Sequence, residues 1–144
     1  MPDPSLAQKT LRIMRVLHAA LLLAAVLYVL LPLLVIKGAM HPPDAVIPLA
    51  FGMSALPALG VALFYRRRFV QPASEALCAN PDDAAAAGRW RQGVLISLVC
   101  CESVVLFGLA LRFIGGSWNL CAIFYVVGIF LMLAWVPRLE LPPT

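Results

Sequence analysis

Residues 93–114 read GVLISLVCCESVVLFGLALRFI, a run of apolar and small side chains with one carboxylate, Glu102, near its middle. A helix needs about 20 residues to cross the ~30 Å hydrocarbon core of a bilayer. The apolar residues follow one another without the alternation typical of strands, so a helix is favoured. We therefore interpret 93–114 as a transmembrane helix that carries Glu102 close to the bilayer midplane.

Three more apolar stretches are long enough, or nearly so, to span a membrane: 17–36, 45–65 and 120–136. The composition agrees, because 62% of the 144 residues are hydrophobic and only 12% are charged, against about 25% charged in soluble proteins. Only helices and closed barrels satisfy the backbone in lipid. The sequence predicts one all-α domain, 1–144, which is an integral membrane four-helix bundle of two antiparallel hairpins.

Basic residues are concentrated on one side of these spans. Cytoplasmic loops carry an excess of Lys and Arg, so both termini and a long middle loop, 66–92, are expected in the cytoplasm of a multi-pass protein of the bacterial inner (plasma) membrane. Lys37 and Arg112 lie on the other side. Nine of the eleven basic residues carry the prediction: Lys9, Arg12, Arg15, Arg66, Arg67, Arg68, Arg89, Arg91 and Arg138.

The ends of the predicted helices carry local signals. Ser5 followed by Gln8 is a capping-box pattern, which predicts a helix that begins near Leu6. The run NPDD at 80–83 predicts another helix start at its proline, with acidic residues at the positive end of the helix dipole. Gly88 is a candidate interruption of that helix. Tryptophans at span ends are typical interface anchors, and three stand there: Trp90, Trp118 and Trp135.

Glu102 is the residue that most needs an explanation. A carboxylate at this depth costs several kcal/mol and is usually tied to function. Counted from the cytoplasmic ends of the spans, Tyr28, Ser54 and Tyr125 fall at nearly the same level, and a hydroxyl can hydrogen-bond a neutral carboxyl. We expect at least one of the three beside Glu102. Two interpretations stay open: a polar contact between helices, or a carboxyl that exchanges a proton or ion or contacts a cofactor or partner subunit.

A ridge of small side chains predicts where helices approach closely. It recurs every four residues along 45–65: Ala50, Ser54, Ala58 and Ala62. The matching groove on 93–114 is expected at Ser97, Cys101 and Gly108. We find no phosphate-binding loop, no nucleophile beside a base and no metal-ligand spacing. The sequence therefore predicts no catalytic residue, no metal, no cofactor and no enzyme.

Residues 89–111 resemble the second helix of the ring (proteolipid, or c) subunits of rotary ATPases. In that family a basic loop precedes a helix with a mid-membrane carboxylate and a Phe/Tyr-Gly-Leu segment, which here would be Glu102 and Phe107-Gly108-Leu109. The resemblance implies proton or ion handling by Glu102. The chain departs from it in its longer middle loop and in having the carboxylate on the third helix. It also resembles uncharacterised small four-helix bacterial membrane proteins, which implies no function.

The preferred hypothesis is a non-catalytic accessory or scaffold subunit of a larger membrane assembly or homo-oligomer, with Glu102 as a polar contact within the membrane. The alternative is a proteolipid-like component for proton or ion transport, and the third is a small transporter. The expected partners are the lipid bilayer and other membrane subunits or further copies of the chain. Nucleic acid is not expected, because Glu75, Asp82 and Asp83 lie among the arginines.

Overall fold

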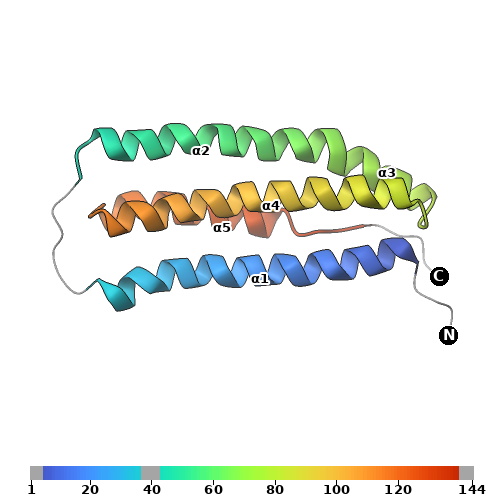
Figure 1. Cartoon of the computed structure of the whole chain (residues 1–144), viewed down its shortest axis with the longest axis horizontal. Helices are drawn as coiled ribbons and strands as arrows, with labels where there is room; N and C mark the ends of the chain where they lie inside the picture. The colour runs from blue at the N-terminus through green and yellow to red at the C-terminus, as the bar shows by residue number, and fades with distance from the viewer. Residues whose placement is uncertain (1–4, 37–42, 140–144) are drawn as a thin grey trace.

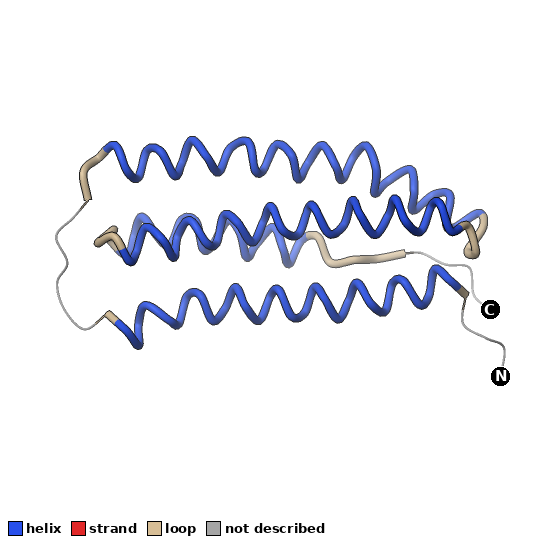
Figure 2. The backbone as a smooth tube through the Cα atoms, in the orientation of Figure 1, coloured by secondary structure: helices blue, strands red, loops and turns tan. Residues whose placement is uncertain are grey.

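The computed structural model describes residues 5–36 and 43–139, which are helical over most of their length and contain no strand (Figure 2). The all-α prediction is confirmed. The elements in chain order are α1 (Leu6–Val35), α2 (Val46–Tyr65), a π-helical segment η1 (Arg66–Val70), α3 (Gln71–Ala79), α4 (Ala84–Phe113) and α5 (Trp118–Ala134).

Three helical segments are long and apolar enough to cross a membrane. They are α1, the continuous stretch Val46–Ala79 that joins α2, η1 and α3, and α4. The fourth predicted span corresponds to α5, which is apolar but has only 17 residues. That length is at the lower limit of about 17–25 residues for a transmembrane helix.

Helix α4 is the central element of the molecule. It packs against α1, α2, α3 and α5, while α1 and α2 lie on opposite sides of it (Figure 1). A much larger share of α4 than of α1 or α2 is buried. Consecutive long helices run in opposite directions along the molecule. Because α4 contacts each of the other helices, its side chains contribute to the placement of all of them.

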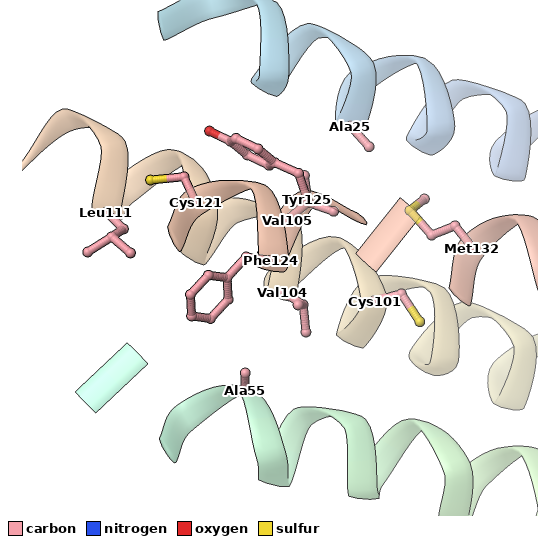
Figure 3. Close-up of a cluster of buried hydrophobic side chains, with 10 residues drawn as sticks. All are labelled: Ala25, Ala55, Cys101, Val104, Val105, Leu111, Cys121, Phe124, Tyr125 and Met132. Carbon is pink, nitrogen blue, oxygen red and sulfur yellow. The ribbon is translucent and has the colours of Figure 1, made fainter. Parts of the chain in front are cut away.

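Two hydrophobic clusters hold the helices together. The central cluster joins α1, α2, α4 and α5, and Figure 3 shows its ten buried residues. The terminal cluster joins the first turns of α1, helix α3 and the first half of α4, around the fully buried Met14, Leu77 and Trp90. The segment 66–79 therefore continues from α2 as helix and bends onto α4. The stretch 66–92 contains η1, α3 and the start of α4 rather than irregular structure.

The start of α1 is capped twice. The predicted capping box is present: the Gln8 amide donates to Ser5 Oγ at 3.3 Å, and the Ser5 amide donates to Gln8 Oε1 at 3.2 Å. The turn before α4 adds two acceptors, since the Leu6 amide donates to Asp82 Oδ1 and the Ala7 amide to the Pro81 carbonyl, both at 3.0 Å. These bonds satisfy donors that a helix start leaves unpaired and fasten α1 to the α3–α4 turn.

Helix α4 begins at Ala84, three residues later than predicted from the proline of 80–83. Asn80 instead closes a local turn, because its Oδ1 accepts from the Asp82 amide at 3.3 Å. Asp83 is the actual cap, and its carboxylate accepts from the amides of Ala85 and Ala86 at 2.9 and 3.0 Å. The expected interruption at Gly88 is wrong: the helix continues through it, since one glycine lowers helix propensity without breaking the hydrogen-bond ladder.

Candidate polar contact site at Glu102

Glu102 of α4 and Tyr28 of α1 meet across the interface of these two helices. The Tyr28 hydroxyl donates to Glu102 Oε1 at 3.3 Å, and both side chains are half-buried. No other hydrogen bond or ion pair of Glu102 is found within residues 5–36 and 43–139. One carboxyl oxygen therefore has a partner inside the chain, and the other remains available to a donor from outside it.

The other two hydroxyls expected at this depth lie elsewhere. Ser54 is exposed, and its hydroxyl donates to the Ala50 carbonyl of its own helix at 2.9 Å. Tyr125 is buried in the central cluster (Figure 3), and its hydroxyl has no hydrogen-bond partner among the described residues. The structure thus brings Tyr28 to Glu102 and leaves Ser54 and Tyr125 apart from it.

One side of α4 is left uncovered, and Glu102 lies at its edge. In Figure 1, α4 stands in front of α5 and between α1 and α2. The uncovered side exposes four large apolar side chains, and helical periodicity places Glu102 and Ser103 on the same side. We define the open face of α4 as Leu95, Val99, Glu102, Ser103, Leu106 and Phe113. The Glu102 carboxyl therefore lies at the edge of an apolar surface, and no part of the described chain covers that surface.

The ridge of small residues on α2 divides between buried and exposed positions. Ala62 is buried and Ala58 packs against the central cluster, whereas Ala50 and Ser54 are exposed. Because 3.6 residues make one turn, each four-residue step rotates the ridge about 40° further round the helix. A mixture of three- and four-residue steps stays on one face, and the packed residues follow it: Ile47, Phe51, Ala55, Ala58 and Ala62.

The residues expected to form a groove on α4 contact two different helices, α2 and α5. Ser97 meets α2, because its hydroxyl donates to the Ala62 carbonyl at 3.2 Å as well as to Gly93 of its own helix at 2.8 Å. Gly108 instead meets α5: a Cβ built there would lie 2.9 Å from Tyr125 Cε1. Gly128 of α5 makes the reciprocal approach, with a built Cβ 2.5 Å from Val105 Cγ2. Gly128 is not among the predicted packing residues, although a glycine inside an apolar helix is a signal of close packing.

The interaction that the described residues show at this site is the hydrogen bond between Tyr28 and Glu102. Within the described residues no group of three His, Cys, Asp or Glu side chains is placed to hold a metal ion. Comparison of the chain with protein-family models, with curated proteins and with solved structures found no match. The Tyr28 hydroxyl and the Glu102 carboxyl can donate and accept hydrogen bonds with a neighbouring polar group.

Proposed function

We propose that this chain is a non-catalytic, multi-pass subunit of a larger membrane assembly or homo-oligomer, and that Glu102 makes a polar contact with a neighbouring subunit. The observation that carries the proposal is the open face of α4, where a half-buried carboxyl stands among Leu95, Val99 and Leu106. Lipid offers no hydrogen-bond donor, so a carboxyl at this depth is stabilised by a polar partner. Tyr28 supplies one such bond from within the chain.

The proposal includes four spans in two antiparallel hairpins, with both termini and the middle loop in the cytoplasm of the bacterial inner membrane. The uneven distribution of Lys and Arg supports this orientation. Two hydrogen bonds join segments that the proposal assigns to the cytoplasmic side. The Ala7 amide donates to the Pro81 carbonyl at 3.0 Å, and Arg15 Nε donates to the Pro137 carbonyl at 3.5 Å. Arg112 stands at the opposite end of α4.

The alternative function is proton or ion handling by Glu102, in a proteolipid-like ring of copies. The observation that favours it is the same exposure of the carboxyl on the open face, since an ion brought by a neighbouring copy reaches Glu102 without a change in the fold. The two functions differ in what they require of the residue. A subunit contact needs a hydrogen-bonding side chain, whereas proton exchange needs an ionisable one.

The test is purification of the tagged chain from native membranes in mild detergent, followed by identification of the co-purifying proteins and measurement of the oligomer mass. We expect a constant partner set or a defined homo-oligomer for the wild type. Glu102→Leu should lose it, while Glu102→Gln should retain it because an amide still hydrogen-bonds. Ser103→Ala is the matched control on the open face, since among the described residues the Ser103 hydroxyl bonds only to the Val99 carbonyl of its own helix, at 2.9 Å.

A wild-type chain that is recovered alone and monomeric would overturn the proposal, and so would an unchanged partner set in Glu102→Leu. Proton or ion handling predicts a different pattern. Under that alternative Glu102→Gln is inactive even when assembled, and a carbodiimide reacts with Glu102 unless sodium or high pH protects it.

A further inference from the structure

A polar cavity lies at the end of the molecule where α2 passes into η1. Its volume is about 150 Å³, about ten times the roughly 10–15 Å³ that one water molecule needs. It is partly open, and its walls are formed by η1, α4, the end of α5 and the segment that follows α5. The side chains that give it chemical character are Arg66, Trp90, Ser97, Trp135 and Arg138, and the remaining lining is aliphatic or proline.

The cavity carries positive charge without a counter-charge. Two arginines line it and no acidic side chain does, among the residues that the structure describes. The Arg66 guanidinium stands 5.1 Å from the centre of the Trp135 ring, which fixes its position. Arg66 is half-buried and has no ion pair with a described carboxylate. A cation that is partly removed from water and unpaired is stabilised by an anion placed against it.

Trp90 independently indicates that a hydrogen-bond acceptor is missing near this cavity. Its side chain is 1% exposed, and its indole N–H is buried without a hydrogen-bond partner within the described chain. Tryptophan can only donate, and a buried donor without an acceptor costs free energy. Trp90 lines the same cavity as Arg66 and Arg138, so the cavity wall contains three donor side chains for an anion with several oxygen atoms.

We propose that this cavity binds a phosphate group, and that an anionic phospholipid headgroup carries it. Tryptophans and arginines at helix ends lie at headgroup depth, and basic pockets between helices on the cytoplasmic side suit phosphorylated headgroups. Arginine forks match phosphate oxygens in geometry. The bound headgroup joins the 135–138 segment to α4 and η1. This site is separate from Glu102, so its test is independent of the proposed subunit contact.

The test uses the full chain in an uncharged detergent, titrated with phosphatidylglycerol, phosphatidylcholine or inorganic phosphate. Retained lipid is counted by native mass spectrometry, and binding is followed by tryptophan fluorescence. We expect phosphatidylglycerol to bind and phosphatidylcholine to bind at least tenfold more weakly. Arg66→Gln and Trp90→Phe should each weaken phosphatidylglycerol binding about tenfold, as loss of a charged hydrogen bond does. Arg67→Gln should stay within about twofold of the wild type.

Arg67 is the matched control because it is exposed, belongs to the same π-helical segment and does not line the cavity. Trp90→Phe removes the N–H together with part of the buried ring system, so circular dichroism and thermal unfolding are measured for each variant to establish that it is folded. An equal loss of binding in Arg67→Gln and Arg66→Gln would overturn the proposal, because it would reveal attraction to net charge alone. Displacement of the lipid by equimolar inorganic phosphate would assign the site to a soluble phosphate and overturn the lipid assignment.

Discussion

Tyr28 and Glu102 are 74 positions apart in the chain, and the tyrosine hydroxyl lies 3.3 Å from Glu102 Oε1. The bond links α1 to the central helix at the edge of the open face of α4. It occupies one carboxyl oxygen and turns the side chain toward α1. The same geometry leaves the second oxygen beside the uncovered apolar surface, where a neighbouring subunit can reach it.

Removal of the Tyr28 hydroxyl should make Glu102 more reactive. We expect Tyr28→Phe to raise the rate of modification of Glu102 by a hydrophobic carbodiimide about two- to tenfold, which corresponds to one neutral hydrogen bond. Mass spectrometry of the peptide that contains Glu102 measures the rate. Tyr65→Phe, at the end of α2 and stacked on Phe69, is the control. Equal rates in the two variants would show that the contact does not restrain the carboxyl.

Leu111 and Leu106 test the difference between the packed side and the open face of α4. Leu111 is fully buried in the central cluster (Figure 3), and Leu106 is 38% exposed. Leu111→Ala should lower the free energy of unfolding by about 2–5 kcal/mol through lost contacts and a cavity. Leu106→Ala should change it by less than about 0.5 kcal/mol and instead reduce recovery of the partner subunits. Unfolding in mixed micelles measures the first effect, and co-purification the second. Similar destabilisation by both variants would contradict an open face.

A side chain at Gly128 should destabilise the protein, because α5 packs closely against α4 at this residue. A methyl group would meet Val105 Cγ2 at 2.5 Å and the Cys101 carbonyl oxygen at 3.0 Å. We expect Gly128→Ala to lower the free energy of unfolding by about 1–3 kcal/mol, the usual cost of overpacking. Gly60→Ala is the control, because a Cβ there meets nothing within 4 Å, and alanine should stabilise that helix slightly. The prediction is wrong if the two variants unfold alike.

Asp83 should contribute to stability through the start of α4. Its carboxylate accepts from two amides of the first turn, at 2.9 and 3.0 Å. Asp83→Ala should cost about 1 kcal/mol, whereas Asp83→Asn should cost much less because an amide oxygen still caps the helix. Equilibrium unfolding of the two variants measures the difference. A loss in Asp83→Asn as large as in Asp83→Ala would indicate that the charge of Asp83, rather than the cap, is what matters.

Local chemistry alone determined which segments are helical and where the first helix begins. The long apolar runs lack the alternation of strands and therefore favoured helices, which satisfy their backbone hydrogen bonds within the segment. Ser5 and Gln8 set the start of α1, since a capping box involves only neighbouring residues. Counting along the predicted spans also identified Tyr28, together with Ser54 and Tyr125, as a candidate neighbour of Glu102.

Only the tertiary structure decided which sides of the helices meet. Depth along a helix does not specify rotation about its axis, so the sequence ranked Tyr28, Ser54 and Tyr125 equally, and the packing of α1 on α4 chose Tyr28. The cavity beside Arg66 and Trp90 likewise needs three segments that are distant in the chain. Rotation and long-range assembly depend on many small packing contacts summed together, which a pattern in the sequence does not record.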